Sequence, residues 1–105
     1  MKKLSVIIPV YNEEKTVEEI VRRVRSASIP LEKELLIVDD ASTDGTGAIL
    51  ERLSHAPDVK GFRHAVNLGK GAGIRTAQPH TTGHLVVLRA ADPEYYPEDN
   101  DLLAA

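Results

Sequence analysis

Two adjacent carboxylates, Asp39 and Asp40, follow a run of apolar residues at positions 35–38. A continuous apolar run of this kind is typical of a strand that is buried on both faces of a parallel sheet. Adjacent carboxylates repel each other, and neither gains from leaving water unless a nearby group needs a negative charge or a hydrogen-bond acceptor. The pair therefore indicates either a binding site at the end of a strand or a solvated turn with an aspartate that caps the next helix.

A second polar loop follows an earlier apolar run and carries residue types suited to a nucleoside. Residues 4–9 are mostly branched aliphatics that end at Pro9, and Tyr11 and Glu13 come next. An aromatic ring offers a flat surface to a base, and carboxylates accept hydrogen bonds from base N–H groups or ribose hydroxyls. The loop lacks a Gly-x-Gly-x-x-Gly pattern, which disfavours a pyrophosphate bound against the following helix as in dinucleotide folds.

A glycine-rich cluster at residues 69–73 surrounds Lys70. Glycines permit close approach of the backbone, and a lysine among them can contact phosphate oxygens. The cluster is not a Walker loop, because Lys70 is followed by glycine rather than by serine or threonine. A flexible loop without a ligand explains the pattern equally well.

The elements that must position these residues alternate along the chain. Strands are predicted at residues 4–9, 34–38, 59–66 and 85–88. Helices are predicted after residue 14, after a cap at Thr43 or Asp44, and at residues 72–77. The order βαβαβαβ predicts an α/β fold with a Rossmann-like parallel sheet in one domain over residues 1–105. The loops at 9–13, 39–42 and 89–92 would then converge at one edge of the sheet.

Composition excludes several classes of function. The chain has 105 residues, a formal net charge of −3 with both signs interspersed, and no cysteine. A nucleic-acid patch, a disulfide framework and a thiolate metal site are therefore not expected. No apolar stretch approaches the roughly 20 residues of a membrane-spanning helix, and we expect a cytoplasmic location. The four histidines lack metal-ligand spacing and are interpreted as surface or loop residues: His55, His64, His80 and His84.

Three segments in order resemble the family 2 glycosyltransferases of GT-A fold, and within them the polyprenyl (dolichyl or undecaprenyl) phosphate sugar transferases. The segments are residues 5–14 (SVIIPVYNEE), 38–46 (VDDASTDGT) and 67–71 (NLGKG). The resemblance implies a nucleotide-sugar site in which Asp40 accepts a hydrogen bond from the base. It further implies that Pro9, Tyr11 and Glu13 line the nucleoside pocket, and that Asp39 and Lys70 lie beside it.

The chain departs from this family after its fourth predicted strand. The family carries an Asp-x-Asp motif there, which holds Mg²⁺ or Mn²⁺ against the diphosphate. The matching positions are Ala90, Ala91 and Asp92, so only Asp92 remains as a metal ligand. Weaker metal binding is expected, because a hard cation loses one anionic ligand. Arg89 would repel a cation, but it could neutralise phosphate directly.

These observations leave three hypotheses for function. The first is transfer of a sugar from a nucleoside diphosphate sugar to an acceptor such as a polyprenyl phosphate. In the family the acceptor side follows the Asp-x-Asp motif, so we expect this chain to hold the nucleotide-binding half and to need a complementing partner. The second is a nucleotide-binding remnant without turnover, and the third is an interaction module. We also expect self-association or a partner chain, because a sheet without its usual covering half exposes apolar surface. The resemblance further implies a location that includes the membrane periphery.

Overall fold

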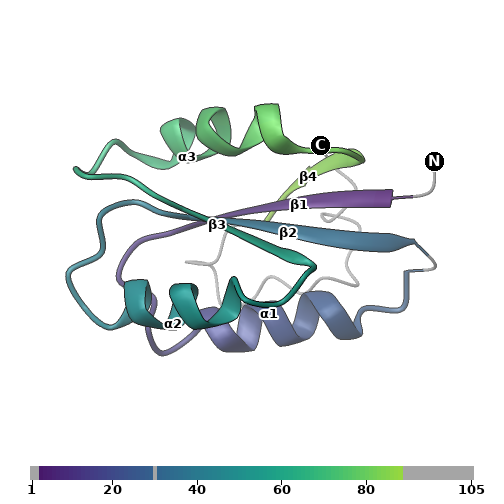
Figure 1. Ribbon diagram of the computed structural model, residues 1–105, viewed down its shortest axis with the longest axis horizontal. Coiled ribbons are helices and arrows are strands. Elements are labelled where there is room, and N and C mark those ends of the chain that lie inside the picture. The colour runs from purple at the N-terminus through teal and green to yellow at the C-terminus, as the bar shows by residue number, and fades with distance from the viewer. Residues whose placement is uncertain (1–2, 30, 89–105) are drawn as a thin grey trace.

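The computed structural model describes residues 3–29 and 31–88, which form one four-stranded sheet with helices on both faces (Figure 1). The strands are β1 (Lys3–Val10), β2 (Glu32–Asp39), β3 (Val59–Arg63) and β4 (His84–Val87). The helices are α1 (Val17–Ser26), α2 (Thr46–Leu53) and α3 (Lys70–Ala77), with a short 3₁₀ helix η1 (Gln78–His80) after α3. The strand order is β3-β2-β1-β4 and every neighbouring pair is parallel, which confirms the predicted βαβαβαβ arrangement.

Helices α1 and α2 cover one face of the sheet, and α3 covers the other (Figure 1). The predicted apolar stripe of α1 is buried against the sheet at Val17, Ile20, Val21 and Val24. A separate, smaller core lies under α3, where Ala77 packs with alternate residues of the strands. Because successive strand residues point to opposite faces, β1 and β2 supply apolar side chains to both cores. This explains their continuous apolar sequences.

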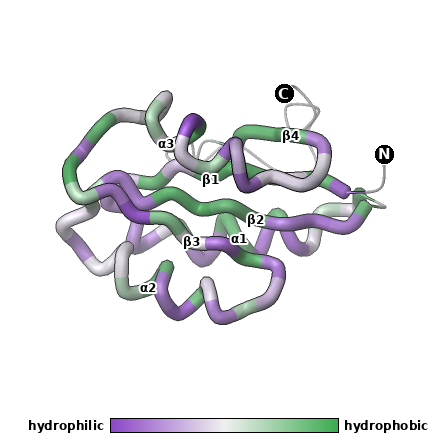
Figure 2. Tube along the Cα trace, turned by 45° about the horizontal axis from the view of Figure 1, so that its top comes forward, coloured by the Kyte–Doolittle hydropathy of each residue, from purple (hydrophilic) through white to green (hydrophobic). Residues whose placement is uncertain are grey.

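Hydropathy along the chain follows this layering (Figure 2). The middle of β1 and the later part of β2 are hydrophobic, whereas β2 begins with the hydrophilic residues 32–34. Among the described residues, no helix has both the length and the apolar character that crossing a membrane requires.

Two element boundaries near the candidate site differ from the predictions. Strand β3 ends at Arg63 rather than at residue 66, because the following backbone leaves the sheet and its amides at Leu68 and Gly69 bond to Asp40. Helix α3 begins at Lys70, two residues before its predicted start. The backbone of Gly69 has φ +92°, a left-handed conformation that glycine adopts without steric cost, and it directs the chain into the helix.

Candidate functional site

The loops after β1 and β2 lie together at the carboxyl edge of the sheet, as predicted. The Asn12 amide donates to Ser42 Oγ at 2.8 Å, and Asn12 Oδ1 accepts from the Thr43 amide at 2.8 Å. The Glu13 amide donates to Thr46 Oγ1 at 2.8 Å. The third loop of the predicted crevice, residues 89–92, lies outside the described residues.

The turn after β2 is held from within by its own aspartates. Asp44 Oδ1 accepts from the Thr46 amide at 2.9 Å and from Thr46 Oγ1 at 2.6 Å, so Asp44 holds the first residue of α2. The N-cap itself is Gly45, so the predicted cap at Thr43 or Asp44 was wrong. Asn12 and Ala41 both have positive φ, at 51° and 64°. Asparagine is common in this conformation, but alanine is not, because its Cβ meets the backbone. The turn at Ala41 is therefore strained.

Asp40 is the centre of the site and is already engaged in several hydrogen bonds. Its residue exposure is 7%, and its amide donates to Val10 O at 2.9 Å, which ties it to the end of β1. Oδ1 accepts from His64 Nδ1 and from the Leu68 amide, each at 2.8 Å. Oδ2 accepts from the Gly69 amide at 2.8 Å. Burial raises the pKa of Asp40, and these hydrogen bonds outweigh it, so the pKa lies below its ordinary value and the group is a carboxylate.

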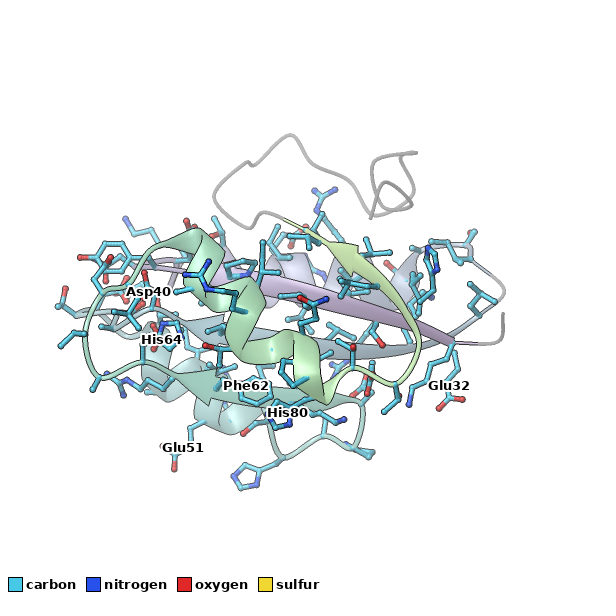
Figure 3. All side chains as sticks on the ribbon, turned by 90° about the horizontal axis from the view of Figure 1, so that it is seen from above. Glu32, Asp40, Glu51, Phe62, His64 and His80 are labelled. Carbon is cyan, nitrogen blue, oxygen red and sulfur yellow. The ribbon has the colours of Figure 1, made fainter. Side chains whose placement is uncertain are left out.

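His64 lies in the loop after β3, but it is buried, so its interpretation as a surface residue was wrong. Its two ring nitrogens lie between Asp40 and Thr76 Oγ1, each contact at 2.8 Å, and Figure 3 shows Asp40 and His64 together at one end of the sheet. Because a carboxylate can only accept, the contact with Asp40 requires the proton of His64 to be on Nδ1. The strand register explains the pairing: β2 and β3 are parallel and Asp39 pairs with Arg63, which puts Asp40 and His64 side by side. The sequence pattern does not give this register.

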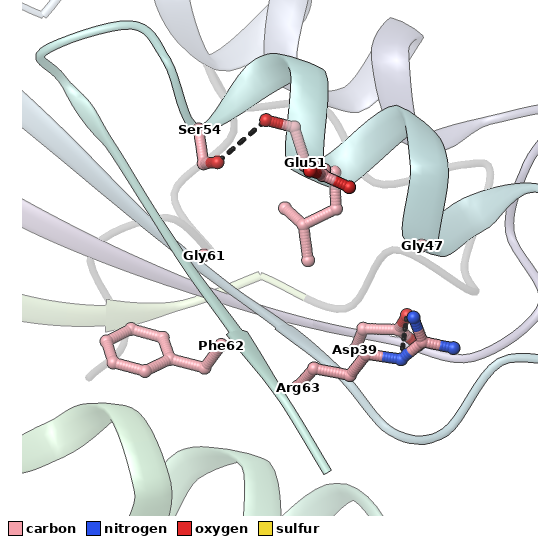
Figure 4. Close-up of a pocket in the computed structure, with 8 residues that line it drawn as sticks. Asp39, Gly47, Glu51, Ser54, Gly61, Phe62 and Arg63 are labelled. Atoms are coloured by element: carbon pink, nitrogen blue, oxygen red, sulfur yellow. Dashed lines mark hydrogen bonds and ion pairs between the residues drawn. The ribbon is translucent and has the colours of Figure 1, made fainter. Parts of the chain in front are cut away.

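Asp39 is fully buried and points into a hollow between α2 and β3 (Figure 4). Oδ1 accepts from the Ser42 amide at 2.9 Å, which fixes the turn. Oδ2 is buried without a hydrogen bond, and Arg63 Nε lies 3.7 Å away as an ion pair. Gly47 leaves room for this arginine, because a Cβ on Gly47 would lie 2.9 Å from Arg63 Nη1. Asp39 thus stabilises the turn beside Asp40 through its contact with the Ser42 amide.

The other predicted residues of the nucleoside pocket lie at the same edge. Tyr11 is 46% exposed and free to take a ligand against its ring. Pro9 is half-buried, and the start of α3 packs closely on it: a Cβ on Gly73 would lie 3.3 Å from Pro9 Cβ. Glu13 Oε1 accepts from Thr16 Oγ1 at 2.6 Å, which directs that carboxylate toward its own turn.

Of the residues predicted to bind phosphate or metal, the structure describes the backbone of Lys70 and does not describe Asp92. Lys70 is the first residue of α3 and follows Gly69, whose amide binds Asp40, so its backbone belongs to the site. Asp92, Ala90 and Arg89 lie outside the described residues. Among residues 3–29 and 31–88, no cluster of three or more histidines and carboxylates could hold a metal ion. The described side chains alone therefore do not form a Mg²⁺ or Mn²⁺ site.

Comparison with known proteins agrees with this architecture. The family model described as glycosyl transferase family 2 matches residues 5–104. The chain belongs to glycosyl transferase family 2. The family prediction made from the three sequence segments is thus confirmed, and the site described above is the carboxyl edge of a family 2 glycosyltransferase domain.

Several solved structures are similar to this family 2 domain over most of its length. TarS from S. aureus, residues 1–349, is 31% identical with a TM-score of 0.73, over 86% of this chain and 27% of that chain. The mannosyltransferase PcManGT from Pyrobaculum calidifontis is 33% identical with a TM-score of 0.74, over 83% and 27%. Glucosyl-3-phosphoglycerate synthase from Mycobacterium tuberculosis is 26% identical with a TM-score of 0.64, over 85% and 33%. This chain therefore spans no more than a third of the length of these structures.

Proposed function

We propose that this domain binds a nucleoside diphosphate sugar at the carboxyl edge of its sheet, as the nucleotide side of a sugar transferase. The observation that carries the proposal is the direct link between the two loops: Asp40 donates its amide to Val10 O, immediately before the exposed Tyr11. A buried carboxylate and an exposed aromatic ring on adjoining loops provide an acceptor and a flat surface for one base. The similar structures include TarS with UDP-GlcNAc and PcManGT with GDP-Man and Mn²⁺.

In this proposal each site residue has a separate task. Tyr11 and Pro9 contact the base and ribose, Asp40 accepts from a base N–H, and Lys70 contributes positive charge toward the diphosphate. Asp39 and Glu13 hold the two loops in place through Ser42 and Thr16. A divalent metal, where Asp92 and the substrate phosphates hold it, would neutralise the leaving diphosphate.

Transfer itself needs groups that the described residues do not supply. Among them, no group of three or more histidines and carboxylates could hold a metal ion. We therefore propose that turnover depends on a complementing acceptor side beyond the described residues, with a polyprenyl phosphate as one acceptor class. Nucleotide binding without turnover is the second candidate function, and the absent ligand cluster in the described residues favours it.

Calorimetric titration of UDP-GlcNAc and GDP-Man against the purified chain, with and without Mn²⁺, tests nucleotide binding. Tyr11→Ala is expected to weaken binding by about tenfold through lost stacking, and Asp40→Ala by at least as much. Glu32→Gln is the matched control, because Glu32 is exposed and lies at the opposite end of the sheet (Figure 3). No binding at high micromolar nucleotide would reject the proposal. Release of free sugar in a parallel assay separates turnover from binding alone.

A further inference from the structure

The hydrogen bonds that Asp40 already makes limit what else it can accept. A carboxylate offers about four acceptor positions, two on each oxygen. On Asp40, Oδ1 has both positions taken by His64 Nδ1 and the Leu68 amide, and Oδ2 has one taken by the Gly69 amide. One acceptor position therefore remains, and it is on Oδ2.

Bases differ in how many adjacent donors they present to such a carboxylate. Uracil presents a single N3–H between two carbonyl oxygens. Guanine presents two donors side by side, N1–H and the N2 amino group, and both need an acceptor. A site that accepts only one of them leaves the other without a partner as the base loses water, which weakens binding.

We propose that the single acceptor position left on Asp40 makes this site select uracil over guanine, so that the donor substrate is a UDP-sugar. The inference rests on the proposed nucleotide site and adds the identity of the base. The fold does not decide this, because the similar structures include complexes with UDP-GlcNAc and with GDP-Man. His64 is then a positioning residue: by occupying Oδ1, it determines how many donors the carboxylate can take.

The test compares UDP, GDP and N3-methyl-UDP on the unmodified chain by calorimetry. UDP is expected to bind about 10- to 100-fold more tightly than GDP, and N3-methylation is expected to cost a similar factor, because each change removes or mismatches one charge-assisted hydrogen bond. GDP binding as tightly as UDP would overturn the selectivity and leave the nucleotide site intact. Absence of binding by all three would overturn the nucleotide site together with the inference.

Variants of His64 test the mechanism of selection. In His64→Leu, Oδ1 of Asp40 gains an open position and Oδ2 keeps the one it already has, so each oxygen has one amide bond and one open position, which suits two adjacent donors. The ratio of GDP to UDP dissociation constants is therefore expected to fall at least threefold. His64→Asn retains an N–H donor and should restore the ratio. Thr76→Val removes only the distal partner of His64, and should leave the ratio unchanged. An unchanged ratio in a folded His64→Leu chain contradicts the inference, and the N3-methyl-UDP comparison decides it if that variant does not fold.

Discussion

Ala41 shows how one residue in the site carries backbone strain. Its φ of 64° lies in the left-handed region, where a Cβ costs about 1–2 kcal/mol relative to glycine. Glycine loses more entropy on folding, so Ala41→Gly is expected to raise the free energy of unfolding by about 0.5–1 kcal/mol. Ala48→Gly, the same change on the exposed face of α2, should lower it by about 0.5–1 kcal/mol. Urea denaturation measures both, and a destabilised Ala41→Gly would show that the strain is absent.

Gly47 lies against Arg63, whose guanidinium pairs with the buried Asp39, so a side chain added at position 47 would contact that guanidinium. The added Cβ would lie 2.9 Å from Arg63 Nη1 and 3.3 Å from Asp39 Oδ2. Gly47→Ala alone therefore combines a helix-propensity gain of about 1 kcal/mol with a weaker ion pair. In an Arg63→Gln background the close approach to the guanidinium is removed, and the helix-propensity gain is opposed only by the 3.3 Å approach to Asp39 Oδ2.

A double-mutant cycle measures this coupling from four unfolding curves. We expect Gly47→Ala to be more stabilising in the Arg63→Gln background than in the unmodified chain, by about 0.5–1.5 kcal/mol. Arg63→Gln by itself should cost about 1 kcal/mol, because Asp39 keeps its burial and loses its counter-charge while the arginine was largely exposed. Additive effects would mean that Arg63 moves aside freely and that Asp39 does not depend on it.

At the scale of elements, a buried carboxylate joins the strands at the end of the sheet opposite the candidate site. Glu34 on β2 accepts from Ser5 Oγ at 2.7 Å, and from the amide and Oγ1 of Thr82 at 2.8 and 2.9 Å. Lys60 Nζ and Lys3 Nζ lie 3.2 and 3.6 Å from its other oxygen. The approach to β4 is thereby fixed against β1 and β2 by polar contacts as well as by the core.

This network predicts how stability depends on pH. Desolvation raises the pKa of Glu34, but the hydrogen bonds from Ser5, Thr82 and Lys60 lower it to about 2 from its ordinary 4.5. A pKa that falls on folding stabilises the protein above the unfolded value, and that contribution is lost as pH falls from about 4.5 to about 2. Glu34→Gln is therefore expected to cost about 2 kcal/mol at pH 7, with the difference from the unmodified chain vanishing near pH 2. A difference that stays constant with pH in thermal unfolding would contradict this.

The same elements show what the sequence can and cannot predict. Apolar runs and the α1 stripe predicted the order of strands and helices, because burial on two faces or on one face leaves a periodic pattern. The end of β3 was missed, because the chain that follows it leaves the sheet and binds Asp40 through the amides of Leu68 and Gly69, which are 28 and 29 residues away from Asp40 in the sequence. The sequence could predict that Asp39 and Asp40 lie at a strand end beside the loop after β1, but not that their two side chains make different contacts. The contacts differ because the Asp39 carboxylate lies beside Arg63, whereas the Asp40 carboxylate accepts from the amides of Leu68 and Gly69.

At the scale of the whole molecule, the candidate binding residues and the buried polar network around Glu34 lie at opposite ends of the strands. The carboxyl edge carries the loops with Tyr11 and Asp40, whereas Glu34 lies near the amino ends of the strands. Among the described residues, large exposed apolar side chains occur at Tyr11, Val66 and Leu68, all in loops after strands. A ligand or an acceptor-side partner at this edge would therefore cover apolar surface as well as meeting the carboxylate.

The two outer strands of the described sheet differ in how they resist further pairing. Strand β3 has exposed Lys60 and Arg63, which discourage another strand, whereas β4 is His84, Leu85, Val86 and Val87. Directly after β4, the Leu88 amide donates to Ile7 O of β1, so by the alternation of a parallel pair the amide of Val87 faces away from β1. A backbone N–H that points outward from an apolar edge strand can pair with a strand of another chain.

We therefore expect the purified chain to self-associate through β4, and Val87→Pro to reduce that association. Proline removes the outward donor without removing a hydrogen bond to β1, and the pre-proline restriction suits the extended Val86. Multi-angle light scattering over a concentration series should show a mass that rises with concentration in the unmodified chain and stays nearer 11.5 kDa in the variant. Val87→Ala keeps the N–H and should still associate. Circular dichroism verifies that both variants are folded, and a concentration-independent monomer before any substitution would refute association through this edge.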